Sequence, residues 1–140
     1  MNKRRASRKR ILQVREKQMK LAIGNAAEAQ HHENELKTNR DRLRKLCAQT
    51  YETQQCDMGR NLHAQMELGQ RLLRAEDALE KALGDARQKL AEAERQRTAA
   101  RIDREAAQKL MAQAKRESED EEIRKQAMMP RAKGPKNRRP

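Results

Sequence analysis

Three histidines and two cysteines are the residues that could bind a metal ion or react, but their spacing favours neither role. His31 and His32 are adjacent, so on a helix their side chains point about 100° apart. Cys47 and Cys56 are separated by roughly 13 Å along a helix axis, which excludes a disulfide within an intact helix. His63 could share a face with Cys56, but two ligands do not make a structural zinc site. We therefore expect no metal site and no cofactor.

Motifs for catalysis or nucleotide binding are also missing from the sequence. There is no glycine-rich phosphate loop ending in GK[ST] and no nucleophile elbow. The two helices predicted below would leave no pocket between them for a substrate. We therefore expect that the protein is not an enzyme.

The strongest chemical signal is a run of basic residues at each end of the chain. Residues 1–10 contain six Lys or Arg and residues 129–140 contain five, with no acidic residue in either run. The ends thus hold 11 of the 34 basic groups, which leaves 23 against 21 acidic groups between them. Such ends could meet nucleic acid, anionic lipid or an acidic protein surface, or could only keep the protein soluble. Neither end has an aromatic residue for base stacking, so we expect no specific nucleic-acid binding.

The composition predicts an all-α fold. Only one residue of 140, Tyr51, is aromatic, 39% are charged and 35% are hydrophobic, which is too little large apolar surface for a globular core. Abundant Ala, Glu, Lys, Leu, Arg and Gln, with five Gly and three Pro, favour long helices. No apolar run approaches the ~20 residues that cross a bilayer, and no signal-peptide core follows the basic start. We therefore expect no transmembrane segment and a cytoplasmic protein.

A heptad repeat in the second half of the chain predicts a helix that packs against another helix. The residues that recur at every seventh position are Leu72, Leu79, Ala86, Ala93, Ala100, Ala107 and Ala114. Larger apolar residues occur on the neighbouring seam at Leu83, Leu90 and Met111. Small side chains let the partner backbone approach closely, which suits an antiparallel pair.

The first half of the chain contains a matching but less regular repeat. One heptad position holds Leu12, Met19, Ala26, Glu33, Arg40 and Cys47, and the other holds Arg15, Ala22, Ala29, Leu36, Leu43 and Thr50. Val14, Ile23 and Leu46 are expected to widen this stripe. Because burying a charged group is costly, Glu33 and Arg40 are expected at the edge of the seam with their charged ends in water.

Together these patterns predict a long two-helix antiparallel coiled-coil hairpin. Its expected parts are a basic N-terminal arm at 1–10, a first helix at 11–55, a turn at 56–65, a second helix at 66–128 and a disordered basic tail at 129–140. The arm is either frayed or the start of a helix that needs a partner. Asp57, Gly59 and Asn61 supply the turn chemistry, and Pro130 ends the second helix.

Several short motifs carry a resemblance that spans nearly the whole chain. They are the break CDMG at 56–59, the segment LEKAL at 79–83, and EDEEIRKQA at 119–127 before the basic tail. With the basic start and the long first helix, they resemble the flagellar FliJ family. They are also similar to the related stalk proteins of injectisome-type secretion systems.

The resemblance implies a noncatalytic component of the flagellar type III protein export apparatus, peripheral to the inner membrane at the flagellar base. Such a component is a central stalk that binds and stimulates the hexameric export ATPase. It also contacts the export gate membrane protein and the export chaperones. The residues implied to face the ATPase ring are Arg4, Arg5, Arg8, Lys9, Arg10, Arg124, Lys125 and Arg131. Those implied, by position alone, to face the export gate are Asn39, Leu43, Leu46, Thr50 and Tyr51.

Two other functions fit the residues. The first is a basic coiled-coil protein that binds nucleic acid or ribosomes nonspecifically, with an affinity that falls steeply with salt. The second is a homodimeric coiled-coil scaffold, whose parallel form would place the two basic ends at opposite poles.

Overall fold

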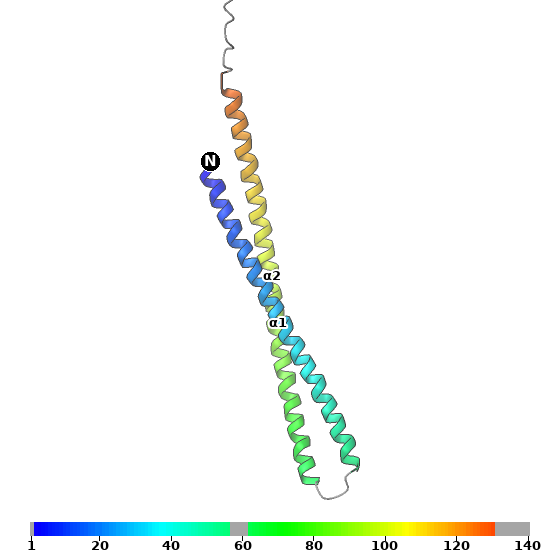
Figure 1. Cartoon of the computed structure of the whole chain (residues 1–140). Helices are drawn as coiled ribbons and strands as arrows, with labels where there is room; N and C mark the ends of the chain where they lie inside the picture. The colour runs from blue at the N-terminus through cyan, green and yellow to red at the C-terminus, as the bar shows by residue number, and fades with distance from the viewer. Residues whose placement is uncertain (1, 57–61, 131–140) are drawn as a thin grey trace, which may run out of the picture. The chain divides into compact units, whose positions relative to one another are not determined.

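The computed structural model describes residues 2–56 and 62–130, and these residues form two α-helices. Helix α1 spans Asn2–Cys56 and α2 spans Leu62–Met128 (Figure 1). The helices pack against each other in antiparallel directions, which confirms the predicted all-α hairpin. The turn residues Asp57, Gly59 and Asn61 and the predicted tail beyond residue 130 lie outside the described residues.

The helix boundaries differ from prediction at two places. Helix α1 begins at Asn2, so residues 2–10 of the predicted arm are the first turns of this helix, which is the second of the two alternatives for the arm. Lys, Arg and Ala are strong helix formers, and Arg8 joins these turns to α2 through its hydrogen bond to the Leu110 carbonyl. Helix α2 begins at Leu62 instead of residue 66 and continues through Gly69, at a cost of about 1 kcal/mol for a helical glycine.

The predicted end of the second helix is confirmed. Helix α2 ends at Met128, two residues before Pro130. The backbone N–H of Met129 closes the last turn by donating to the carbonyl oxygens of Lys125 at 3.2 Å and Gln126 at 3.3 Å. A proline at position 130 cannot continue this ladder because it has no N–H to donate.

The hairpin divides into two compact units. The terminal unit comprises Met1–Gln18 and Ala100–Pro140, and the turn unit comprises Met19–Ala99. Each unit therefore contains one segment of α1 and one segment of α2.

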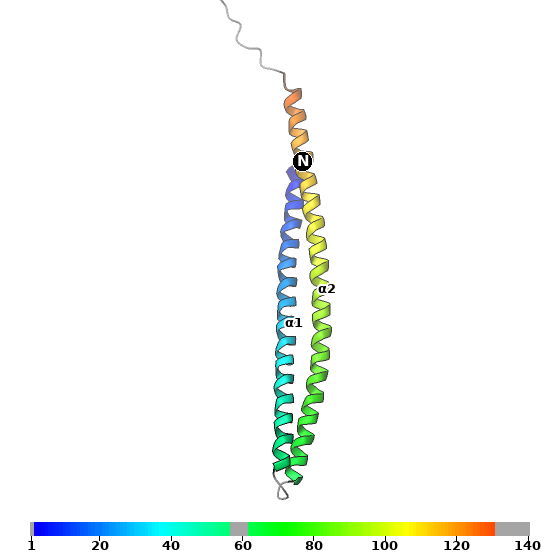
Figure 2. The same cartoon turned by 90° about the vertical axis from the view of Figure 1, so that its right-hand side faces the viewer.

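The terminal unit brings the start of α1 beside residues 103–116 of α2 of the same chain (Figure 2). The Arg8 guanidinium donates to the Leu110 carbonyl at 3.3 Å, and Arg15 pairs with Asp103 at 3.1 Å. Arg15 follows Arg8 by seven residues in α1, and its partner Asp103 precedes Leu110 by seven residues in α2, as an antiparallel register requires. This intrachain pairing is the opposite of the parallel homodimer, which would have kept the two ends apart.

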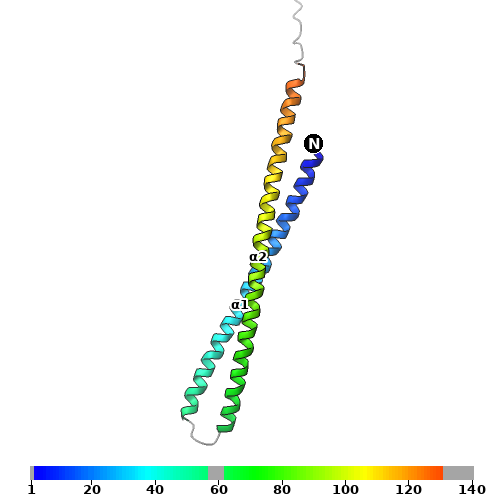
Figure 3. The same ribbon diagram turned by 180° about the vertical axis from the view of Figure 1, so that it is seen from behind.

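Helix α2 is longer than its partner in the terminal unit. The register of the Arg8 and Arg15 contacts places Asn2 opposite residue 116. Residues 117–128 of α2 therefore continue past the start of α1, as the rear view also shows (Figure 3). This overhang is a single helix without α1 alongside it.

The predicted seam is confirmed in both units. In the turn unit Met19, Ala22, Ala26, Leu83, Ala86 and Ala93 are buried, and Leu83 is only 1% exposed. In the terminal unit Ala107 and Ala114 are buried. Small residues therefore occupy most of the buried positions, which is the arrangement that lets two helix backbones lie close together.

Three apolar residues expected to widen the first helix's stripe are exposed instead. Val14, Ile23 and Leu46 are 53%, 46% and 54% exposed. A helix that packs against only one neighbour covers a narrow seam, about two positions in each heptad. Residues beside that seam stay in water, so the prediction for these three positions was wrong.

Glu33 was also predicted wrongly, because its side chain is buried rather than at the edge of the seam. The residue is 5% exposed. Its Oε1 accepts from Lys37 Nζ at 2.8 Å and lies 3.6 Å from Arg87 Nε of α2, while Oε2 accepts from Gln30 Nε2 at 3.3 Å. These three donors replace water around the carboxylate, which removes the reason to place it outside. Arg40 remains at the edge and pairs with Asp41 at 3.3 Å.

Glu33 makes the stability of the hairpin dependent on pH. The hydrogen bond from Lys37 lowers the pKa of Glu33 below its ordinary value of 4.5, against the opposing effect of burial and with added attraction from Lys37 and Arg87. A depressed pKa in the folded state contributes stability that is complete above pH 4.5 and is lost as the pH falls through the folded pKa.

We expect urea unfolding followed by circular dichroism to show this loss on acidification below pH 4.5. In Glu33→Gln the loss should be smaller, because the carboxylate that gains a proton is gone. Glu35→Gln is the matched control, since the Glu35 carboxylate is 60% exposed. Equal acid sensitivity in the wild type and Glu33→Gln would contradict the assignment.

Candidate functional site

The start of α1 presents a basic surface in the terminal unit. We define this surface by five exposed cations, Lys3, Arg4, Arg5, Lys9 and Arg10. None of the five pairs with an acidic residue within the described part of the chain. Arg8, from the same predicted set, is half-buried and bonded to Leu110. The basic surface is thus open to an anionic partner.

Packing against α2 holds the basic surface in place. The buried Ala107 and Ala114 let the start of α1 approach α2, and the Arg8 and Arg15 contacts join the two helices. Both contacts are exposed to solvent, so each adds at most about 1 kcal/mol. The positioning of the basic surface therefore depends mainly on the seam.

Helix α2 adds basic residues that the sequence-based set did not include. Lys109, Lys115 and Arg116 are exposed and belong to the stretch of α2 that runs beside residues 2–10. Lys115 forms a long, solvent-exposed ion pair with Glu119, with 3.9 Å between Nζ and Oε1. These three residues could have been predicted to lie beside the start of α1 only if the register between the two helices had been known.

The structure does not gather all eight residues that the resemblance assigned to an ATPase ring. Arg124 and Lys125 are exposed on the overhang, roughly 12 Å along the helix beyond the point opposite Asn2. The acidic run between them and the basic surface consists of Glu117, Glu119, Asp120, Glu121 and Glu122. Arg131 lies outside the described residues. Two separate basic groups therefore flank an acidic segment.

The residues assigned to an export gate lie in the turn unit and differ in exposure. Asn39, Leu46 and Tyr51 are exposed, whereas Leu43 and Thr50 are half-buried at the seam. The Thr50 hydroxyl donates to the Leu46 carbonyl at 2.8 Å, which occupies it within α1. Of this set, only Tyr51 lines the larger cavity described next.

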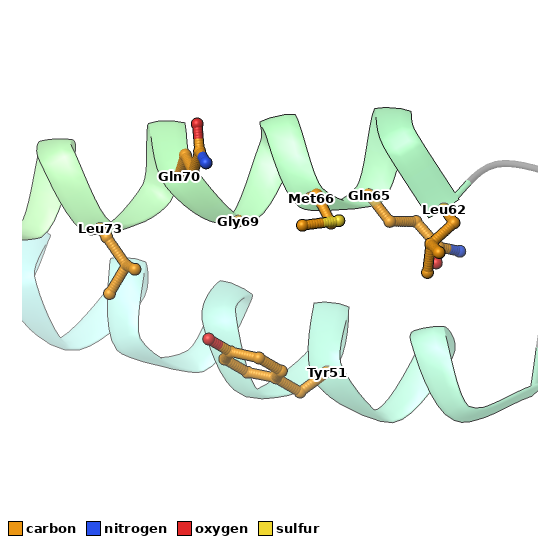
Figure 4. Close-up of a pocket in the computed structure, with 7 residues that line it drawn as sticks. All are labelled: Tyr51, Leu62, Gln65, Met66, Gly69, Gln70 and Leu73. Atoms are coloured by element: carbon orange, nitrogen blue, oxygen red, sulfur yellow. The ribbon is translucent and has the colours of Figure 1, made fainter.

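A groove opens between the last turns of α1 and the first turns of α2, and we call it the turn-end groove. Tyr51 of α1 lines it together with Leu62, Gln65, Met66, Gly69, Gln70 and Leu73 of α2. Leu62, Met66 and Leu73 point towards α1, and the Tyr51 ring lies across from Gly69 (Figure 4). Its volume is about 500 Å³. A smaller cavity of about 50 Å³, lined by the free Cys47 and by Thr50, adjoins it through Tyr51, Gly69 and Leu73.

The groove residues on α2 were missed at the level of sequence. Leu62 and Gln65 lie in the segment 56–65, which the sequence predicts as a turn and to which it assigns no helical face. Helix α2 begins four residues earlier than predicted, and this extra turn adds Leu62 and Gln65 to the wall that Met66, Gly69, Gln70 and Leu73 form.

No group of three or more His, Cys, Asp or Glu side chains in residues 2–56 and 62–130 is placed to hold a metal ion. No helix in that part of the chain is both long enough and apolar enough to cross a bilayer. Comparisons of the chain with protein-family models, with curated proteins and with solved structures found no match.

Proposed function

We propose that this chain is a noncatalytic stalk of the flagellar type III export apparatus that binds and stimulates the hexameric export ATPase. The observation that supports the proposal is the basic surface on the first turns of α1, held against α2 and left without acidic partners in the described chain. The resemblance of the sequence to the FliJ family supplies the identity of the partner.

The proposed mechanism follows from symmetry and charge. A hexameric ring presents six equivalent subunits, whereas one pair of helices presents different side chains in every direction. The basic surface therefore interacts with some subunits more strongly than with others, and this difference shifts their conformational populations unequally. Stimulation of ATP hydrolysis would result because the stalk favours one state of the subunits it contacts.

The remaining partners belong to the same proposal. Contacts with the export gate membrane protein and with export chaperones are assigned to the last part of α1, where Asn39, Leu46 and Tyr51 are exposed. The chain would then work in the cytoplasm, peripheral to the inner membrane at the flagellar base.

The test is the steady-state rate of ATP hydrolysis by the export ATPase of the same organism, with and without this chain at near-physiological salt. We expect a several-fold increase that saturates as the chain is added. No increase, with an ATPase shown to be hexameric, would contradict the proposal.

A parallel titration with duplex DNA separates the stalk from a nonspecific nucleic-acid binder. Binding through released counterions weakens steeply as salt rises and does not depend on base sequence. Strong DNA binding at physiological salt, together with an unchanged ATPase rate, would favour the nucleic-acid function.

A further inference from the structure

The turn-end groove is an apolar surface that the described residues of the chain leave exposed. The exposed fractions of Tyr51, Leu62, Met66 and Leu73 are 58%, 66%, 60% and 53%. Leu46 and Leu68, also exposed, belong to the same helix ends. Large apolar side chains gathered in this way are uncommon on a surface that faces only water, and they mark a site of association.

Gly69 gives this surface a shape that can receive another side chain. A Cβ placed on Gly69 would meet no atom within 4 Å. The glycine thus leaves a notch between the Tyr51 ring and the neighbouring turns of α2 (Figure 4). Met66 stands beside the notch, and its flexible thioether adapts readily to an irregular partner surface.

The charges around the groove are compatible with self-association. The flanking segments 43–52 and 62–76 contain four basic residues, Arg44, Lys45, Arg71 and Arg74, and three acidic residues, Glu52, Glu67 and Glu76. Arg44 pairs with Glu76 at 3.4 Å and Arg71 with Glu67 at 2.6 Å. A surface with both signs nearly balanced does not repel a copy of itself, whereas residues 2–10 hold six basic residues and no acidic one.

We propose that the turn-end groove binds the turn-end groove of a second copy of this chain, related to the first by a twofold axis. In such an isologous contact each chain contributes both a notch at Gly69 and the apolar side chains that enter the partner's notch. The four helix ends then form a short four-helix bundle that covers Tyr51, Met66 and Leu73 on both chains. Each chain contributes only a few apolar side chains to the contact, so we expect a weak dimer with a dissociation constant on the order of micromolar.

Sedimentation equilibrium of the full chain over a concentration series tests the proposal. The wild type should pass from monomer to dimer as its concentration rises. Met66→Glu and Leu73→Glu should each raise the dissociation constant at least about tenfold, because each places a carboxylate in the apolar contact. Both side chains are exposed in the single chain, so circular dichroism should show unchanged helicity.

Leu21→Glu is the matched control for these variants. Leu21 belongs to the same unit and is 67% exposed, but it does not line the groove. This variant should dimerise like the wild type. Equal weakening by Leu21→Glu, or a wild type that stays monomeric throughout, would overturn the proposal and leave the groove to a different partner.

The inference does not rest on the proposed export function. The groove belongs to the turn unit, whereas the basic surface belongs to the terminal unit. A chain that stimulates the ATPase but never dimerises would contradict only the dimer. A chain that dimerises without stimulating the ATPase would contradict only the stalk.

Discussion

Replacing Arg4, Arg5, Lys9 and Arg10 with alanine should return the ATPase to its unstimulated rate. These cations are exposed and unpaired in the described chain, so a partner's carboxylates can reach them without breaking existing bonds. At about 1 kcal/mol for each lost ion pair, four substitutions weaken binding roughly a thousandfold. Helicity should be retained, because alanine is the strongest helix former. Hydrolysis rate against stalk concentration is the measurement.

A second quadruple variant removes the same charge from a different place. Lys20, Arg42, Lys45 and Arg74 are exposed, belong to the turn unit and form no ion pair among the described residues. Replacing all four with alanine should leave stimulation near the wild-type level. If the two variants lose stimulation equally, net charge rather than the basic surface controls binding, and the assignment of the terminal unit fails.

Leu83→Ala should be the most destabilising single substitution in the described seam. Leu83 is 1% exposed and is the only large side chain in the described residues with less than 2% exposure. Truncating a buried leucine to alanine costs about 2–5 kcal/mol, and a two-helix seam that can partly close should lie at the lower end of that range. Urea unfolding followed by circular dichroism measures the change.

Leu21→Ala controls for the change in residue type. Its side chain is 67% exposed, so little apolar surface returns to water and the effect should stay within about 0.5 kcal/mol. A comparable loss in both variants would mean that helix propensity or the unfolded chain, and not seam packing, determines stability.

The sequence by itself determined which faces of the two helices are buried. Ala86, Ala93, Ala107 and Ala114 recur at one heptad position, and all four are buried in the structure. The end of α2 at Met128 was also predictable, because Pro130 cannot donate to a helical ladder. Periodicity and proline chemistry are local properties of the sequence, so they can be recognised without knowledge of the tertiary structure.

The burial of Glu33 and the presence of the turn-end groove both depend on residues that are distant in the sequence. Glu33 could not be recognised as buried from its own helix, because one of its cations, Arg87, comes from α2. The turn-end groove likewise needs Tyr51 of α1 and Met66 and Leu73 of α2 at one level along the pair. Gln30 and Lys37 lie within reach of Glu33 on its own helix, but the contact with Arg87 and the facing walls of the groove depend on both helices.

Only the tertiary structure decided the register between the helices. A ladder of nearly identical small residues keeps its buried face when one helix slides by seven positions, so the heptad pattern permits several alignments. Polar contacts distinguish among them: Arg15 with Asp103 in the terminal unit, and Arg44 with Glu76 in the turn unit. This register places Lys109 and Lys115 beside the basic start of α1 and leaves residues 117–128 as an overhang. The sequence of one helix cannot fix the register, because each contact across the seam requires a side chain from both helices.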